Sequence, residues 1–135
     1  MAGYSGTPLA QKLGIKPGAV VALLGAPAGF ERALAPVPDG VRFTARAAGT
    51  PALIIWFATS RAAIDRRIAD VARLVTDGVG LWVAWPKLSS GVRTDLREDA
   101  VRTAGLAHGL VDYKVCAIDD TWSGLKFARR RKSRP

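Results

Sequence analysis

Three nearly uninterrupted apolar runs divide the chain, at 19–24, 52–58 and 80–86. A run of this length between turn-forming residues predicts a strand that is buried on both of its faces. The third run, Gly-Leu-Trp-Val-Ala-Trp-Pro, is expected near the centre of a sheet because helical patterns lie on both sides of it. Strands that alternate with helices predict a parallel sheet.

The clearest helix follows the second apolar run. Ser60 is placed to cap its first turn, and Gly78 suits the left-handed conformation at its end. Apolar residues recur between them at helical spacing and predict one buried stripe. The stripe consists of Ile64, Ile68, Val71, Leu74 and Val75.

Shorter elements are predicted on either side of this unit. A short helix is expected from Pro8, with Thr7 as its cap and Gly14 at its end. Another is expected over 30–35, followed by a short edge strand over 41–45.

The last third of the chain predicts a helix and a hairpin. Asp95 and Glu98 have the spacing of a capping box, which places the start of a helix near Asp95. Strands are expected over 110–118 and 121–129, joined by a tight turn at Asp119 and Asp120 into an antiparallel hairpin. The whole pattern predicts a three-layer α/β sandwich with a mostly parallel sheet, Rossmann/flavodoxin-like, and a C-terminal antiparallel hairpin.

Charge is distributed unevenly along the 135 residues. The formal net charge is +9, from 20 Lys and Arg against 11 Asp and Glu. The last seven residues hold five of the cations, namely Arg129, Arg130, Arg131, Lys132 and Arg134. Residues 1–128 therefore carry 15 − 11 = +4, and we expect them to form a single domain followed by a basic, disordered tail at 129–135.

Composition indicates a cytoplasmic globular protein. Apolar residues make up 49% of the chain, yet no apolar run approaches the roughly 20 residues of a membrane span. The start of the sequence lacks the charged and apolar regions of a signal peptide. Cys116, the single cysteine, lies among apolar residues and is expected to be an inert core residue.

Several segments resemble one bacterial family. These are Leu-Trp-Val-Ala-Trp-Pro-Lys at 81–87, Gly-Leu-Val-Asp-Tyr-Lys-Val-Cys-Ala at 109–117, and Asp119 with Trp-Ser-Gly-Leu-Lys-Phe at 122–127. Leu-Gly-Ile-Lys-Pro-Gly at 13–18 is similar to the family's N-terminal segment. The family is the "domain of unknown function 3052", and the resemblance covers nearly the whole chain. It implies a small cytoplasmic α/β domain and carries over no catalytic residue.

The loop Gly-Ala-Pro-Ala-Gly at 25–29 stands where a Rossmann-type fold binds phosphate, between a buried strand and a helix. Its glycines do not have the spacing of a dinucleotide fingerprint, and the Lys-Ser/Thr pair of a P-loop is missing. No acidic residue clearly ends the next strand to hold a ribose. A plain strand-to-helix turn is therefore the favoured interpretation over a nucleotide loop.

Polar residues are expected at the carboxyl edge of the predicted sheet, where α/β proteins bind ligands. The candidate ligand-binding set is Gly25, Gly29, Ser60, Trp85, Lys87, Ser89, Ser90 and Asp119. A lysine, several hydroxyls and an exposed indole would suit a small anionic or sugar-like ligand. Each member also has a structural interpretation as a helix cap, a core aromatic, a solvated loop residue or a turn former, and this interpretation is slightly favoured.

Other polar residues indicate little chemistry. His108 is the only histidine and has no Cys or Glu at ligand spacing, so no metal site is predicted and a capping or surface role is expected. Asp112 and Lys114 should share a strand face as an ordinary salt-bridged pair.

Three functional hypotheses follow. The first is a non-catalytic module that binds a small anionic ligand or a protein partner in the carboxyl-edge crevice, since no catalytic pairing is visible. The second is a Rossmann-like enzyme that acts on a small anionic substrate. The third is non-specific nucleic-acid binding by the basic tail. The sequence identifies no cofactor, ligand or oligomeric state.

Overall fold

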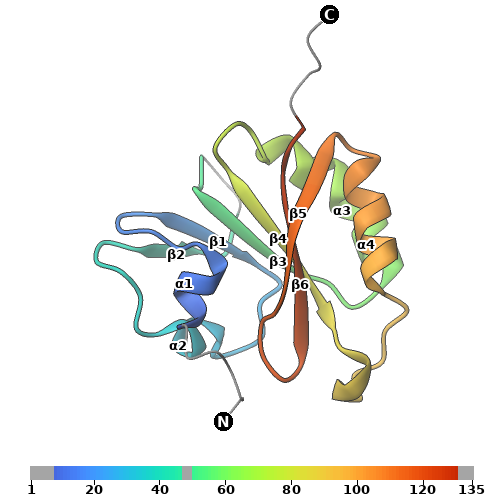
Figure 1. Cartoon of the computed structure of the whole chain (residues 1–135), viewed down its shortest axis with the longest axis horizontal. Coiled ribbons are helices and arrows are strands. Elements are labelled where there is room, and N and C mark those ends of the chain that lie inside the picture. Colours follow the sequence, from blue (N-terminus) through green and yellow to red (C-terminus); the bar gives the residue numbers. More distant parts are fainter. Residues whose placement is uncertain (1–7, 47–49, 131–135) are drawn as a thin grey trace, which may run out of the picture.

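The computed structural model describes residues 8–46 and 50–130. A six-stranded sheet in the order β2-β1-β3-β4-β6-β5 organises the fold (Figure 1). The strands are β1 (Val20–Leu24), β2 (Arg42–Thr44), β3 (Leu53–Phe57), β4 (Gly80–Pro86), β5 (Leu110–Ala117) and β6 (Trp122–Arg129). The helices are α1 (Leu9–Leu13), α2 (Phe30–Leu34), α3 (Arg61–Leu74), the 3-10 turn η1 (Leu88–Ser90) and α4 (Glu98–Leu106).

The first four strands are parallel, and the last two are antiparallel to their neighbours. The predicted mostly parallel sheet with a C-terminal hairpin is therefore confirmed. β6 lies between β4 and β5, so the hairpin enters the sheet through its second strand. No helix in the described ranges is long and apolar enough to cross a membrane.

Helices cover both faces of the sheet and complete three layers (Figure 1). α1 and α2 pack on one face, where Leu13, Phe30 and Leu34 belong to one buried cluster. α3 and α4 pack on the other, where Ile64, Ile68 and Val101 belong to a second cluster. Strand residues alternate between the two clusters, as side chains of a buried strand must.

Trp82 in β4 joins the sheet to α1. Its side chain is fully buried, and its indole Nε1 donates a hydrogen bond to the carbonyl oxygen of Leu13 at 2.9 Å. A buried indole N–H needs such a partner. The bond therefore fixes the end of α1 over the centre of the sheet.

Close packing also fixes α4 on the sheet. Gly105 faces Phe127 of β6, which is 1% exposed. A Cβ atom at Gly105 would lie 2.6 Å from Cζ and 2.8 Å from Cδ1 of the Phe127 ring. The missing side chain is what lets the helix approach the ring.

The α3 prediction is confirmed apart from Leu74. The Ser60 hydroxyl accepts a hydrogen bond from the Ala63 amide at 3.1 Å, and Ile64, Ile68 and Val71 are buried. Leu74, expected in the stripe, is only half-buried, whereas the next residue, Val75, is fully buried as predicted.

The predicted capping box at Asp95 is wrong. α4 begins at Glu98 and has no side-chain cap. The Asp95 carboxylate instead accepts a hydrogen bond from the Arg61 amide at 2.8 Å. It therefore stabilises the start of α3, where exposed amides and the helix dipole favour a negative charge.

The shared face predicted for Asp112 and Lys114 is wrong as well. The register between β5 and β6 shifts between these two residues, so a bulge separates them. Asp112 pairs with Arg102 of α4 at 2.9 Å, whereas Lys114 lies opposite Lys126. An inserted residue breaks the two-residue alternation on which the prediction depended.

The predicted tail begins too early, because Arg129 is the last residue of β6. Its guanidinium donates from Nε to the Val75 carbonyl oxygen at 2.8 Å and also contacts the Ala72 carbonyl oxygen. A cation here complements the exposed carbonyls at the end of α3. Arg130 follows the strand, while Arg131, Lys132 and Arg134 lie outside the described residues.

Candidate functional site

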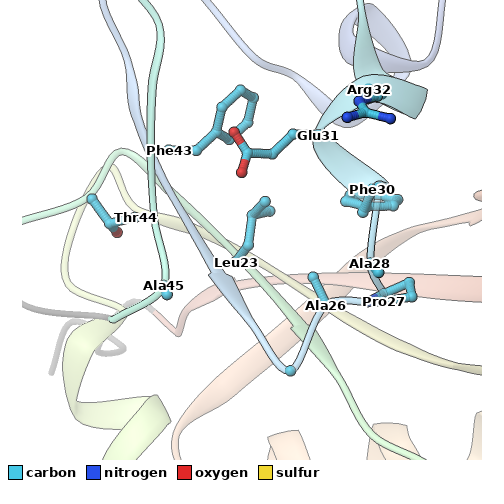
Figure 2. A pocket seen from close by; sticks show the side chains of 12 residues that line it. Leu23, Ala26, Pro27, Ala28, Phe30, Glu31, Arg32, Phe43, Thr44 and Ala45 are labelled. Atoms are coloured by element: carbon cyan, nitrogen blue, oxygen red, sulfur yellow. The ribbon is translucent and has the colours of Figure 1, made fainter.

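A hollow of about 820 Å³ opens at the carboxyl ends of β1 and β2. The loop from Gly25 to Gly29 forms one wall with the start of α2, and the end of β2 forms the opposite wall (Figure 2). The lining residues are Leu23, Gly25, Ala26, Pro27, Ala28, Gly29, Phe30, Glu31, Arg32, Phe43, Thr44 and Ala45. The volume is within the range of small-molecule sites.

The hollow adjoins the point where the sheet's winding reverses. From β1 the chain passes through α2 to β2 on one side. On the other side of β1 lies β3, from which the chain passes through α3 to β4. The two crossover helices cover opposite faces, so the loops after β1 and β3 diverge. Such a divergence is the usual ligand site of open α/β sheets.

Two glycines shape the loop wall. Gly25 and Gly29 have φ angles of 69° and 82°, a left-handed conformation that favours glycine. A Cβ atom at Gly25 would lie 3.0 Å from the carbonyl oxygen of Phe57 in β3. The loop backbone at Gly25 therefore passes directly against the neighbouring strand, where a larger side chain would not fit.

α2 is anchored so that its polar residues face the hollow. Phe30 is buried, and its ring meets that of Phe57 edge-on at 4.8 Å between centroids. The next residue, Glu31, extends its carboxylate into the hollow near Phe43 and Leu23 (Figure 2). The site thus places one carboxylate beside two apolar side chains, while Arg32 adds a positive charge at its margin.

Of the eight predicted ligand-binding residues, Gly25 and Gly29 line this hollow. Ser60 caps α3 through its hydroxyl. Trp85 is 6% exposed and packs in the core beside α3 and α4, so the exposed indole expected at the crevice is absent. The apolar residues around β4 bury the Trp85 ring, so no face of this ring is open to a ligand.

Two of the polar residues after β4 make hydrogen bonds with backbone carbonyls. The Lys87 amide donates to the Thr121 carbonyl oxygen at 2.7 Å, and the Ser90 hydroxyl donates to the Lys87 carbonyl oxygen at 2.7 Å. Ser89 is exposed in η1. Lys87, Ser89 and Ser90 do not line the hollow beside β1. Their shared ligand site remains a prediction.

Asp119 shapes the β5–β6 turn, since its carboxylate accepts hydrogen bonds from the Thr121 and Trp122 amides, both at 2.8 Å. His108 lies at the end of α4 with Nδ1 3.0 Å from the Ala104 carbonyl oxygen, which agrees with the predicted capping role. Burial raises the pKa of the half-buried Cys116 thiol, which opposes formation of a thiolate. Among the described residues, no group of three His, Cys, Asp or Glu side chains could hold a metal.

Sequence reasoning missed the second wall of the hollow. Phe43 and Thr44 enter the site because β2 pairs in parallel with β1, with Val21 opposite Phe43. The available signal was the order of the elements predicted within 19–45, which is strand, loop, short helix and strand. Such a βαβ unit brings the carboxyl ends of its two strands to one edge of the sheet. Glu31 carried no signal of its own, because an acidic first turn is common in helices.

This chain is similar to known proteins in its fold alone. No family model matches the sequence, and neither does any curated protein. Solved structures with the same fold include a ribosomal protein L11 methylase from Lactobacillus delbrueckii, at 12% identity and a TM-score of 0.62. The match covers 91% of this chain and 75% of that one.

Two further structures extend the comparison. The magnesium protoporphyrin IX methyltransferase ChlM from Synechocystis, with bound SAM, has 13% identity and a TM-score of 0.58 over 90% of this chain and 74% of its own. A protein of the NADB-Rossmann superfamily from Streptococcus agalactiae has 14% identity and a TM-score of 0.53, over 96% and 71%. The Rossmann-like fold predicted from the sequence is confirmed.

These comparisons overturn the first functional hypothesis. The expected non-catalytic module was inferred because no catalytic pairing was visible in the sequence. The structures that share the fold are mainly methyltransferases. The sequence of this chain contained no motif that indicated this class of enzyme. The prediction of a non-catalytic module is therefore wrong, and the alternative of a Rossmann-like enzyme agrees better with the fold.

Proposed function

We propose that this chain is a Rossmann-like methyltransferase that binds S-adenosylmethionine in the hollow after β1. The observation that carries the proposal is the position of the hollow, beside the reversal point of a sheet whose fold is shared with methyltransferases. When bound, S-adenosylmethionine would supply an activated methyl group for transfer to an acceptor.

The lining residues fit a ligand that contains a nucleoside. Leu23 and Phe43 offer apolar surface to a base, and the Glu31 carboxylate can accept hydrogen bonds from the two ribose hydroxyls. Gly25 and Gly29 contribute backbone without side chains to the wall of the hollow.

Glu31 has particular importance because β2 supplies no carboxylate. β2 ends at Thr44, and Ala45 and Arg46 follow it. Rossmann-type sites hold the ribose with an acidic side chain, and here the only acidic lining residue comes from α2. Arg32 provides charge complementarity for a small anionic acceptor, the substrate class expected from the sequence.

Binding of S-adenosylmethionine, measured by isothermal titration calorimetry, tests the proposal. Glu31→Gln keeps the side chain's shape and removes its charge, so we expect the affinity to fall about tenfold, equivalent to about 1.4 kcal/mol. Asp77→Asn, an exposed change beyond the end of α3, is the matched control and should leave the affinity unchanged. Absence of binding by the unmodified chain would contradict the proposed function.

We also propose, from the sequence motifs, that the chain is a cytoplasmic member of the "domain of unknown function 3052" family. Its segments at 81–87, 109–117 and 122–127 support this assignment. The tail-mediated binding of nucleic acid stays a prediction, with Arg129 removed from the tail by its contacts to α3.

A further inference from the structure

A second pocket, of about 300 Å³, lies at the opposite edge of the sheet, where β3 and β4 begin. It is lined on one side by Gly14, at the end of α1, and by Gly80, the first residue of β4. The polar and aromatic side chains of the lining are Tyr113 and Lys126 from the hairpin, and Lys16. This pocket shares no lining residue with the hollow after β1.

Lys126 is half-buried at this pocket without a carboxylate partner among the described residues. Its ammonium lies 5.6 Å from the ring centroid of Trp82 and 5.7 Å from that of Tyr113. Its hydrogen bond to the Leu13 carbonyl oxygen is 3.5 Å long. Aromatic faces and one distant carbonyl hold the cation in place but do not neutralise its charge.

The backbone around Lys126 leaves room for its side chain. A Cβ atom at Gly14 would lie 2.8 Å from the Lys126 ammonium, and one at Gly80 would lie 3.1 Å from its Cε. Gly14 also has a φ angle of 85°, so the turn after α1 depends on glycine as well. Two glycines therefore surround the lysine where larger residues would displace it.

Other positive charges add to that of Lys126. Lys114 lies directly opposite it across the β5–β6 ladder, a like-charge pair that is unfavourable in a sheet. Burial, followed by the charges of Lys114 and Lys16, lowers the pKa of Lys126 from its ordinary value. A bound anion would relieve this repulsion.

We propose that the pocket formed by Lys126, Lys16 and Tyr113 binds a small anion that carries phosphate groups. Two lysines supply the charge, and the exposed Tyr113 hydroxyl can donate a hydrogen bond to a phosphate oxygen. A multiply charged anion fits better than a single carboxylate because two lysines line the pocket and the nearby Lys114 adds to the positive charge around Lys126. The volume suits a pyrophosphate-sized ligand.

The test is calorimetric titration with sodium pyrophosphate and with inorganic phosphate, at an ionic strength held constant with sodium chloride. We expect pyrophosphate to bind the unmodified chain and Lys126→Met to weaken binding at least tenfold. Arg66→Met removes one exposed positive charge from α3 and is the matched control. It should bind pyrophosphate as the unmodified chain does, since general charge attraction is screened by salt.

A second variant distinguishes loss of anion binding from loss of folding. Lys16→Met changes an exposed residue of the same pocket and should also weaken pyrophosphate binding. Equal affinity for the unmodified chain and Lys126→Met, or equal weakening in Arg66→Met, would overturn the proposal. Binding of an RNA oligonucleotide without binding of pyrophosphate would also overturn it. S-adenosylmethionine binding should be unchanged in Lys126→Met, so the two proposals fail independently.

Discussion

Replacing Gly105 by alanine has two opposing effects on the stability of the protein. Alanine is the better helix former, by about 1 kcal/mol, and propensity alone predicts a more stable protein. Packing predicts the reverse, because the new methyl group would lie 2.6 Å from Cζ of Phe127. Ordinary carbon contacts lie at about 3.5–4.0 Å, so the helix or the ring must move by about 1 Å.

The ring has little freedom to move, since Phe127 is 1% exposed in the core. Overpacking a core costs about 1–3 kcal/mol, and a clash with several ring atoms belongs near the upper limit. After the gain in propensity is subtracted, we expect Gly105→Ala to lower the free energy of unfolding by about 2 kcal/mol. With a urea m-value of about 2 kcal/mol/M, the midpoint should fall by about 1 M.

Urea unfolding followed by tryptophan fluorescence measures this change. Thr103→Ala, exposed on the same helix, is the control and should show only the gain in propensity. Phe127→Leu combined with Gly105→Ala should recover about 1–2 kcal/mol relative to the sum of the single changes, because the smaller side chain makes room for the methyl group. A higher urea midpoint for Gly105→Ala would refute the packing of α4 on Phe127.

Three other predictions test separate parts of the structure. Ile68→Ala should lower the free energy of unfolding by about 2–5 kcal/mol, and Leu74→Ala by less because Leu74 is half-buried; equal urea midpoints would contradict the orientation of α3. Arg129→Met should cost about 1–3 kcal/mol in the same assay by leaving carbonyls at the end of α3 without their donor, and an unchanged midpoint would remove that role. Iodoacetamide should alkylate Cys116 more slowly than free cysteine at pH 7.5 and faster as pH rises, because its raised pKa lowers the thiolate fraction; a rate equal to that of free cysteine would contradict its burial.

Local patterns explain which parts of the fold were predictable. Ser60 caps α3 by accepting a hydrogen bond from the amide of Ala63, three residues later. Ile64 and Ile68 repeat at helical spacing, so a short window of sequence contains the whole signal. The apolar runs at 19–24 and 52–58 likewise predict buried strands wherever their partners lie. Their parallel pairing followed from the helices between them.

Contacts between distant segments explain the errors. Asp95 has the spacing of a cap for α4, yet it accepts its hydrogen bond from Arg61, 34 residues away. Arg129 belongs by composition to a basic tail, but its guanidinium finds carbonyls at the end of α3. Either pairing depends on how α3, α4 and β6 pack, which no short window of sequence contains.

The candidate site divides along the same line. The loop at 25–29 was visible because glycine and proline mark a turn after a strand. Phe43 was visible only as part of an edge strand, and its place in the hollow depends on the pairing of β2 with β1. The predicted convergence of Ser60, Trp85 and Lys87 assumed that residues near one sheet edge all face outward, whereas Trp85 faces the core.

The position of β6 between β4 and β5 has a consequence for the order of folding. As the chain is synthesised, β5 emerges first but has no partner in the sheet until β6 has been made. Until then β4, whose residues are nearly all apolar, presents an open edge that can pair with another chain. Nascent chains that stop before about residue 122 should therefore aggregate, and a chaperone that shields β4 would act in that interval.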